Sequence, residues 1–447
     1  MTASGPDLAM HADLLIHNIG QLVTLAGPPG PRRGAAMREP GIIEDAAVAI
    51  AGGRIVAVGK NDELVATVQP AAALDADGRA VVPGFVDPHT HLPWAGHRAA
   101  EFEMRIGGAT YMQIMAAGGG IARTVADTRA ASLEMLVAET RGRLNRMLAH
   151  GTTTAEAKTG YGLNLSDELK QLAVIAELQR THPVDLVPTF LAAHAIPPEF
   201  EGRPDAYVDL IVDALLPAAW AYRQELKYDN DSPGAGHSRL GDSVNPAGSS
   251  SYPFFCDVFC EAGAFDLAQS RRILTAARRL GFGLKIHVDE FAPLGGASLA
   301  VELGAISADH LVTTPAGQVT QLARSDVIGV ALPGTPFGLG QRDYSPARAL
   351  IDQGGALALA TDLNPGTCWC ENMQFIIALA CRAMRLLPAE ALTAYAIGLG
   401  DRVGSIEPGK SADLLLLDAD DYRMLAYRFG TNLVHGVVKH GAVVHSA

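Results

Sequence analysis

The stretch Pro83-Gly-Phe-Val-Asp-Pro-His-Thr-His91 places two histidines, His89 and His91, directly after a short apolar run. Residues i and i+2 on an extended backbone share one face, so both imidazoles can reach a single metal ion. Taken alone, a His-x-His pair also arises by chance or packs within a turn, so it needs support from the rest of the chain. The stretch therefore indicates a metal-dependent enzyme as the first hypothesis.

The composition is that of a compact folded chain. With 447 residues, of which 48% are hydrophobic and 19% charged, the chain can bury a large core. Its formal net charge of −13 argues against nucleic acid as a partner, because binding to a phosphate backbone needs concentrated lysine and arginine. A small anionic ligand can still bind where a local arginine supplies the charge.

The sequence shows no run of about 18 apolar residues and no signal-peptide pattern. We therefore expect no membrane partner and a cytoplasmic location. The cysteines lack the spacing of a disulfide framework, and we interpret them as reduced thiols: Cys256, Cys260, Cys368, Cys370 and Cys381. The pair in Cys368-Trp-Cys370 has no second pair beside it, so a structural zinc site is not expected there.

Both ends of the chain are rich in short alternating runs of apolar and polar residues. Such runs predict strands at 47–50, 54–58, 413–418 and 437–444, with glycine-containing turns between several of them. Two β-rich ends that flank a long middle predict one small β-sandwich domain, built from residues 1–80 and 402–447.

The middle of the chain, residues 81–401, alternates between two patterns. Helical periodicity covers 133–150, 167–180 and 267–280, and apolar runs that precede polar residues cover 184–190, 283–286, 327–332 and 356–360. This repetition predicts a (β/α)8 TIM-type barrel, in which functional side chains lie at the carboxyl ends of the strands. An open doubly wound sheet is the rival, but it gives no reason for metal-type residues to recur after successive strands. We expect a polar surface insertion at about 219–251.

Histidines and one aspartate follow the predicted barrel strands in order. They are His89, His91, His194, His287, His310 and Asp362. Any one of these histidines, taken singly, is more often a hydrogen-bonded core residue than a ligand. As an ordered series, three neutral imidazoles and one carboxylate suit a Zn²⁺ or Fe²⁺ ion that keeps a coordination position open for water.

The order of these residues resembles the amidohydrolase superfamily, and linked motifs along the chain resemble the imidazolonepropionase family within it. The motifs are Glu101-Phe-Glu-Met-Arg105, Gly108-Ala-Thr-Tyr-Met112, Ala116-Ala-Gly-Gly-Gly120, Lys158-Thr-Gly-Tyr-Gly162, Ala193-His-Ala-Ile-Pro-Pro198, Lys285-Ile-His-Val-Asp-Glu290 and Ala360-Thr-Asp-Leu-Asn-Pro-Gly-Thr367. The resemblance extends from about residue 13 to residue 444.

The resemblance implies a hydrolase that opens 4-imidazolone-5-propanoate to N-formimino-L-glutamate in histidine catabolism. It implies one zinc or iron ion (Fe²⁺ or Fe³⁺) per subunit, held by His89, His91, His287 and Asp362. Asp362 would also take a proton from the attacking water. His310 would hydrogen-bond the attacked carbonyl or the attacking oxygen, and Glu290 would move a proton to or from the ring nitrogens.

The same resemblance implies a substrate-binding set. Arg98 is expected to clamp the propanoate of the anionic substrate. Tyr161, His194 and Glu290 would contact the substrate, and a loop containing Asn364, Gly366 and Thr367 would hold the amino-acid portion of the product. The resemblance also implies a homodimer.

The chain departs from the family pattern at three places. The insertion at 219–251 is longer than usual, 391–399 is shorter, and Cys368-Trp369 replaces a more common Ser-Pro. Lys158 lies in a motif of mononuclear members, so we leave it out of the ligand set. Two other functions stay open: a hydrolase or deaminase acting on another cyclic amide, hydantoin or aminated heterocycle, and a non-enzymatic relative. The second predicts missing ligands, whereas this sequence keeps every one.

Overall fold

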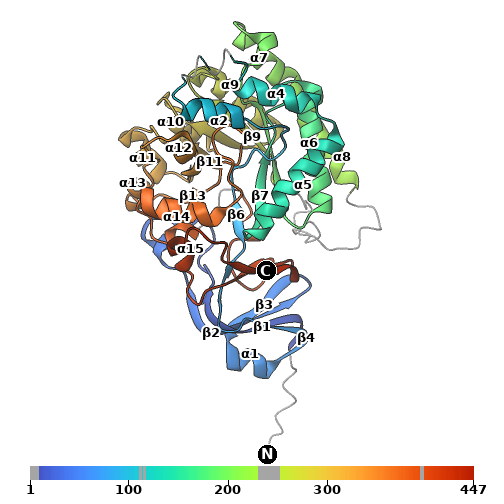
Figure 1. Ribbon diagram of the computed structural model, residues 1–447, viewed down its shortest axis with the longest axis vertical. Helices are drawn as coiled ribbons and strands as arrows, with labels where there is room; N and C mark the ends of the chain where they lie inside the picture. Colours follow the sequence, from blue (N-terminus) through green and yellow to red (C-terminus); the bar gives the residue numbers. More distant parts are fainter. Residues whose placement is uncertain (1–9, 110–112, 114–116, 230–251, 393–396, 447) are drawn as a thin grey trace, which may run out of the picture.

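A barrel of eight parallel strands forms the middle of the chain (Figure 1). The computed structural model describes residues 10–109, 113, 117–229, 252–392 and 397–446. In order around the barrel, the strands are β6 (Phe85–Asp87), β7 (Thr152–Lys158), β8 (Asp185–Ala193), β9 (Phe255–Cys260), β10 (Gly283–Val288), β11 (Ser307–His310), β12 (Ile328–Ala331) and β13 (Leu357–Leu359). A parallel bridge between Thr90 and Leu363 joins the segments that follow the first and last strands. The predicted (β/α)8 barrel is confirmed, and this bridge excludes the open sheet.

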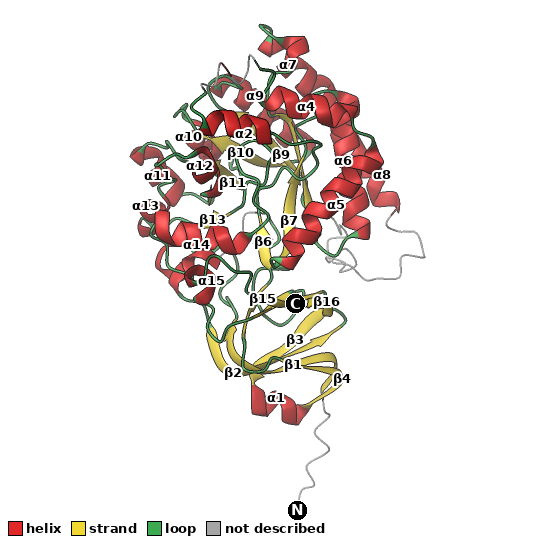
Figure 2. Ribbon diagram, in the orientation of Figure 1, coloured by secondary structure: helices red, strands yellow, loops and turns green. Residues whose placement is uncertain are grey.

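Helices connect the strands and surround the barrel (Figure 2). They are α2 (Ala99–Ile106), α4 (Ile121–Ala130), α5 (Leu133–Ala149), α6 (Leu165–Thr181), α7 (Pro204–Leu210), α8 (Leu216–Asp229), α9 (Leu267–Leu280), α10 (Gly296–Leu303), α11 (Ala316–Ala323), α12 (Gly334–Leu339), α13 (Ala347–Asp352) and α14 (Met373–Ala383). The predicted helices at 133–150, 167–180 and 267–280 are all present. Helix α9 has the predicted capping box between Asp266 and Gln269, and it ends at Gly281, whose φ of 102° suits a glycine.

The two ends of the chain share a second eight-stranded sheet. The strands are β1 (Met10–Val23), β2 (Ile42–Ala51), β3 (Arg54–Lys60), β4 (Val68–Asp75), β5 (Ala80–Pro83), β14 (Leu414–Leu417), β15 (Val434–Lys439) and β16 (Ala442–Ser446), with the short helices α1 (Asn61–Thr67) and α15 (Met424–Tyr427). Figure 1 shows the N-terminal strands in blue and the C-terminal strands in red side by side below the barrel. Strand β5 takes the sheet past the predicted boundary at residue 80, because it pairs with β1 and β14.

This second sheet curves back on itself. Ile55 of β3 shares one buried apolar cluster with Leu414 of β14, although these strands lie far apart in the order of the sheet. Arg54 also forms an isolated bridge with Ser411, directly before β14. The two halves of the sheet therefore face each other across one core, which is the arrangement expected of a small β-sandwich.

The sequence interpretation was wrong about the last strand. A single strand was expected over 437–444, but the structure has a hairpin of β15 and β16. His440 and Gly441 make the turn, with φ values of 49° and 76°. Two residues with positive φ form a tight turn whose twist suits a hairpin. In the sequence, valines on both sides of Lys439 and His440 concealed this turn.

The first part of the predicted insertion is helical. Residues 219–229 belong to helix α8 rather than to a polar loop, because Ala219 and Trp220 pack on the barrel core. The rest of the predicted insertion, 230–251, lies outside the described residues. The stretch 391–399, where a shortening was predicted, begins within a 3-10 turn at Glu390–Leu392. Residues 393–396 of this stretch lie outside the described residues.

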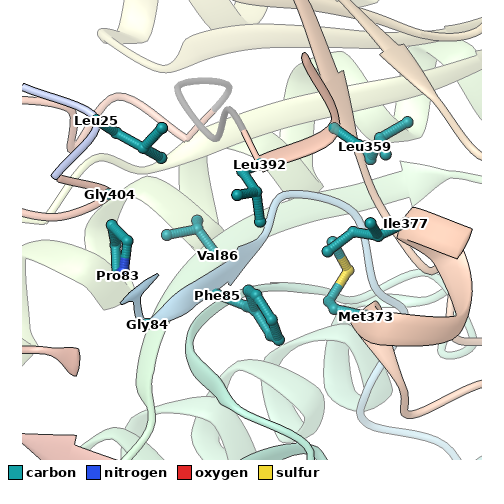
Figure 3. Close-up of a pocket in the computed structure, with 11 residues that line it drawn as sticks. Leu25, Pro83, Gly84, Phe85, Val86, Leu359, Met373, Ile377, Leu392 and Gly404 are labelled. Carbon is teal, nitrogen blue, oxygen red and sulfur yellow. The ribbon is translucent and has the colours of Figure 1, made fainter. Parts of the chain in front are cut away.

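A small apolar cavity lies between β6, β13 and α14 (Figure 3). Phe85, Leu359 and Met373 line it from the barrel side, and Leu25 and Gly404 close it on the side of the second sheet. Every lining residue is apolar, so this cavity offers no acid or base to a reaction.

Within the described ranges, no helix has the length and apolar character needed to cross a membrane.

Candidate active site

Closure of the barrel brings the His-x-His stretch beside Asp362. The backbone N–H of Asp362 donates to the carbonyl of His89 at 3.1 Å, and that of His91 donates to the carbonyl of Leu363 at 3.0 Å. Deeper in the barrel, Thr361 donates from its backbone N–H and its hydroxyl to the two carboxylate oxygens of Asp87. These contacts fix the first and last strands in register, so residues 273 positions apart form one site.

The predicted ligands face one another at the carboxyl end of the barrel. Nε2 of His91 lies 3.5 Å from Nε2 of His287 and 3.5 Å from Oδ1 of Asp362. Nε2 of His89 lies 3.6 Å from the same carboxylate oxygen. All four side chains are buried, so their donor atoms converge on a space that is shielded by protein.

The outer nitrogens of two of these histidines contact carboxylates. Nδ1 of His89 lies 2.6 Å from Oδ2 of Asp309, and Nδ1 of His287 lies 3.0 Å from Oδ2 of Asp257. A hydrogen on Nδ1 leaves the lone pair on Nε2, the nitrogen that points into the site. Nε2 of His89 is buried and has no hydrogen-bond partner among the described residues. A bound metal ion would satisfy this nitrogen.

The surroundings of His89 and His91 keep these two imidazoles neutral. Burial lowers the pKa of His89 far below 6.5, and the cations and imidazoles around it lower the pKa further. Burial and the neighbouring His287 do the same for His91. A neutral imidazole is the form that binds a metal. Together with His287 and the carboxylate of Asp362, these imidazoles fit a single zinc or iron ion and leave room for a further ligand.

The two carboxylates belong to a network of fully buried charged residues, which the sequence interpretation missed. Its members are Glu156 and Lys158 of β7, Asp257 of β9, Lys285 of β10 and Asp309 of β11. Lys158 Nζ lies 2.6 Å from Asp257 and 2.8 Å from Glu156, and Lys285 Nζ lies 3.1 Å from Glu156. The available signal was Glu156-x-Lys158 and Lys285-x-His287, since residues at i and i+2 of a strand share a face.

Lys158 is an ammonium in this network. Burial alone would lower its pKa, but the carboxylates of Asp257, Glu156 and Asp309 outweigh that effect and raise the pKa above its ordinary value. A lysine must lose its proton before it can form a carbamate. The ion pairs therefore agree with the omission of Lys158 from the ligand set.

The two other predicted catalytic residues lie next to the ligands. Nε2 of His310 is 3.7 Å from Oε2 of Glu290, and the ring centroids of His310 and His287 are 5.2 Å apart. His310 and Asp362 have positive φ values of 77° and 54°, so the chain turns sharply after β11 and β13 and aims both side chains inward. Burial lowers the pKa of His310 to about 3. Burial, with Asp362 and Glu261 nearby, raises the pKa of Glu290 well above 4.5.

Asp362 has a second partner that the sequence did not reveal. The hydroxyl of Thr335, at the start of α12, donates to Oδ2 of Asp362. The other oxygen, Oδ1, is the one that faces His89 and His91. Thr335 therefore orients the carboxylate so that one oxygen points to the proposed metal position.

Tyr161 and His194 form an aromatic wall beside the ligands. The ring of His194 stacks on His91 with centroids 4.8 Å apart and planes tilted by 16°. Tyr161 lies 5.2 Å from His194 between centroids, and Nδ1 of His194 is 3.0 Å from the carbonyl of Gly160. Both predicted substrate residues thus border the metal position from the loops after β7 and β8.

Arg98 and the loop after β13 meet at Gly366. A Cβ placed on Gly366 would lie 2.3 Å from Nη1 of Arg98, so the guanidinium packs directly against this glycine. The amide of Asn364 is engaged within its own loop: its oxygen accepts from the backbone N–H groups of Gly366 and Thr367, and its nitrogen donates to Thr367 Oγ1 and to the Asp362 carbonyl. Asn364 therefore shapes the loop, and its contact with substrate stays a prediction.

Comparisons with known proteins identify the family. The model of the Amidohydrolase family matches residues 114–445. An imidazolonepropionase from Herpetosiphon aurantiacus is 53% identical over 440 residues, with 97% of each chain covered. One from Chloroflexus aggregans is 52% identical, covering 97% of this chain and 98% of its own. The chain belongs to the imidazolonepropionase family of amidohydrolases.

Solved structures agree with this assignment at the level of the fold. An adenosine deaminase from Xanthomonas campestris with bound zinc has a TM-score of 0.67 and 21% identity, covering 97% of this chain and 93% of its own. A guanine deaminase from E. coli has a TM-score of 0.65 and 15% identity, covering 97% and 99%. At this low identity the likenesses show the fold of the chain alone and say nothing about substrate.

All the predicted site residues of this imidazolonepropionase-family chain lie at one end of the barrel. The ligand set, the His310–Glu290 pair and the aromatic wall are in mutual contact. Arg98 joins them through Gly366 of the loop that follows Asp362. Their separate roles in metal binding, catalysis and substrate binding stay predictions.

Proposed function

We propose that this chain hydrolyses the ring amide of 4-imidazolone-5-propanoate and releases N-formimino-L-glutamate. The observation that carries the proposal is 53% identity to an imidazolonepropionase over nearly the whole chain, combined with a complete set of converging ligands. One water is consumed: its oxygen joins the ring carbonyl carbon, the bond from that carbon to the ring nitrogen breaks, and the nitrogen receives a proton. Membership of the family makes the chain a metal-dependent hydrolase of a small molecule.

We propose that His89, His91, His287 and Asp362 hold one zinc or iron ion. The converging Nε2 atoms, the Nε2 of His89 without a hydrogen-bond partner, and the lowered pKa of His89 and of His91 support this ligand set. When bound, such an ion supplies Lewis acidity, which polarises a carbonyl and allows water to attack at neutral pH. Imidazole and carboxylate accept either metal, so metal analysis of the purified protein decides between them.

The chain's own residues would handle the protons. Asp362 presents Oδ1 to the site while Thr335 holds Oδ2, so Oδ1 is the atom placed to take the proton of the attacking water. Glu290 has a raised pKa, which suits a carboxyl that carries a proton at neutral pH. It can deliver this proton to the leaving ring nitrogen, which leaves poorly without it. The neutral imidazole of His310 can donate a hydrogen bond to the developing oxyanion.

The remaining residues would bind and orient the substrate. Arg98 supplies a positive charge at the rim of the site and is the proposed partner of the propanoate. Tyr161 and His194 offer a flat wall against which the planar ring can lie, next to His91. The turn of residues 364–367 would close over the amino-acid end of the product. We also propose a homodimer on the strength of the family resemblance, which light scattering of the purified protein tests.

Turnover of the candidate substrate tests this function. We expect the purified protein to consume 4-imidazolone-5-propanoate, followed by its ultraviolet absorbance, and to form N-formimino-L-glutamate, identified by mass spectrometry. Hydantoin propanoate and aminated heterocycles should be poor substrates in the same assay. Faster turnover of one of these compounds would keep the hydrolase and contradict the proposed substrate, whereas no turnover of any of them by the metal-loaded protein would contradict both.

A further inference from the structure

Glu101 is a buried carboxylate on α2 that none of the catalytic steps uses. Only 7% of the residue is exposed. Its Oε1 accepts from Arg98 Nη2 at 2.6 Å and from Arg105 Nη2 at 2.9 Å. Its Oε2 accepts from Arg98 Nε at 2.9 Å and from the backbone N–H of Gly120 at 2.8 Å. Glu101 is therefore the point at which both ends of α2 and the start of α4 are tied together.

Arg98 and Glu101 form a bidentate contact, which fixes the orientation of the guanidinium. Two parallel N–H donors on two carboxylate oxygens leave the planar group little freedom to rotate. Burial raises the pKa of Glu101, but the hydrogen bonds from Arg98 and Gly120 outweigh it and leave the pKa below its ordinary value. The carboxylate is thus ionised at neutral pH, and its two hydrogen bonds with Arg98 are charge-assisted.

The edge of Arg98 that Glu101 does not hold faces the active site. Nη1 packs against Gly366, in the loop directly after Asp362. Burial raises the pKa of Tyr161, and the positive charge of Arg98 partly opposes that rise. The two hydrogen bonds to Glu101 therefore determine the direction of the remaining N–H donors of Arg98.

The local charge is positive although the chain is acidic overall. Arg98 and Arg105 share the single carboxylate of Glu101, so this cluster keeps one surplus positive charge in a chain of net charge −13. Arg105 offsets the charge of Glu101, which allows Glu101 to orient Arg98 without neutralising it. An anionic side chain on the substrate is the group that this arrangement suits.

We propose that Glu101 is a positioning residue that aims Arg98 at the carboxylate of the substrate and so sets the preference for an anionic side chain. The inference rests on the proposed function, in which Arg98 binds the propanoate. Glu101 itself does not touch the substrate in this account. It acts through Arg98, and Arg105 acts by balancing the charge of Glu101.

Charge and positioning make opposite predictions for the loss of this carboxylate. If Glu101 mattered only as a negative charge, Glu101→Gln would make the cluster more positive and lower the KM for an anionic substrate. If Glu101 positions Arg98, the same substitution releases the guanidinium and raises that KM. The sign of the change in KM therefore separates the two roles.

The experiment compares 4-imidazolone-5-propanoate with its uncharged propanamide analogue. For Glu101→Gln we expect the KM of the anionic substrate to rise about tenfold, the worth of one charged hydrogen bond, with kcat nearly unchanged. The kcat/KM of the propanamide should stay at the wild-type value. Glu103→Gln is the matched control, because Glu103 is an exposed glutamate on the same helix. A lower or unchanged KM, or equal losses for both compounds, overturns the proposal.

Two further variants complete the test. Glu101→Asp keeps the charge but shortens the side chain, so it should also raise the KM of the anion if the grip matters. It serves as the test variant if Glu101→Gln does not fold. Arg98→Ala separates this inference from the proposed function. If Arg98→Ala raises the KM of the anion and both Glu101 variants do not, only the positioning role fails. If Arg98→Ala also leaves that KM unchanged, the proposed propanoate clamp fails with it.

Discussion

Lys158 Nζ lies 2.6 Å from Oδ2 of Asp257, and the same oxygen lies 3.0 Å from Nδ1 of His287. A lysine on the second barrel strand thus acts on a proposed ligand of the fifth strand through one carboxylate of the fourth. Asp309 gives His89 the equivalent partner at 2.6 Å, with Lys285 Nζ 3.6 Å from the same oxygen. Each ligand histidine with a carboxylate partner is therefore held by a carboxylate that is itself held by a lysine.

Removing the charge of Asp257 should weaken the proposed metal site. Asp257→Asn keeps the shape of the side chain but gives Lys158 and His287 a weaker partner, so we expect metal affinity to fall about 10- to 100-fold. Competition with a coloured chelator measures the affinity directly, independent of turnover. Asp213→Asn, on an exposed residue, is the control and should match wild type. Equal affinities for Asp257→Asn and wild type would show that this contact does not tune the site.

Gly366 should tolerate no side chain. A Cβ at this position would lie 2.3 Å from Nη1 of Arg98 and 2.8 Å from its Cζ, so Gly366→Ala must displace the guanidinium or the loop. We expect the KM for 4-imidazolone-5-propanoate to rise about tenfold or more. Steady-state kinetics with the wild type alongside gives this ratio.

Gly317→Ala is the control for that substitution. Gly317 lies in helix α11, and a Cβ there would meet no atom within 4 Å. Alanine favours a helix more than glycine does, so this variant should keep wild-type kinetics and gain slightly in stability. A rise in KM for both glycine variants would point to a general effect of substitution rather than to Arg98.

Lys439 should hold the barrel and the second sheet together. Its Nζ lies 2.6 Å from Asp413 of the terminal segment and 2.6 Å from Asp185, the first residue of β8. All three side chains are buried, so Lys439→Met leaves two carboxylates without their cation. Breaking a buried pair in this way costs about 3–5 kcal/mol. Urea unfolding should show that loss, whereas a change below about 1 kcal/mol, the worth of an exposed pair, would contradict it.

The same ion pair predicts a pH dependence of stability. Burial would raise the pKa of Asp185, but Lys439 and His440 outweigh it and hold the pKa below its ordinary value of 3.8. A carboxyl with a depressed folded pKa stabilises the fold above its unfolded pKa and loses that contribution as the pH falls below it. The difference in unfolding free energy between wild type and Lys439→Met should therefore shrink as the pH falls from neutrality, because burial raises the pKa of Asp185 once Lys439 is gone and the variant takes up the proton first. If this difference in unfolding free energy instead grew as the pH fell, the proposed role of the ion pair would be contradicted.

The convergence of the proposed ligands could be predicted from the sequence because its signals are local. His89 and His91 are two residues apart, and His287 and Asp362 each follow a recognisable apolar run. In a parallel barrel all strand ends of one kind meet at the same rim, so the fold itself converts this order into proximity. The order of the residues and the family motifs were enough to choose the barrel over an open sheet.

The supporting contacts could not be predicted in the same way. Glu156, Lys158, Asp257 and Lys285 lie on different strands, and their pairing depends on the register of those strands around the barrel. Thr335 reaches Asp362 from α12, where nothing in the local sequence marks it. The hairpin at His440 and Gly441 and the helical start of the expected insertion were missed because packing against the rest of the fold decides both.

The central claim is a single metal position formed by His89, His91, His287 and Asp362 that is required for ring opening. The most direct measurement is turnover of 4-imidazolone-5-propanoate while protein stripped of metal by a chelator is titrated with zinc or with ferrous iron. The account predicts negligible turnover at the start, a linear rise, and saturation at one equivalent of metal per chain. Full turnover by the stripped protein, or saturation only at two equivalents, would contradict it.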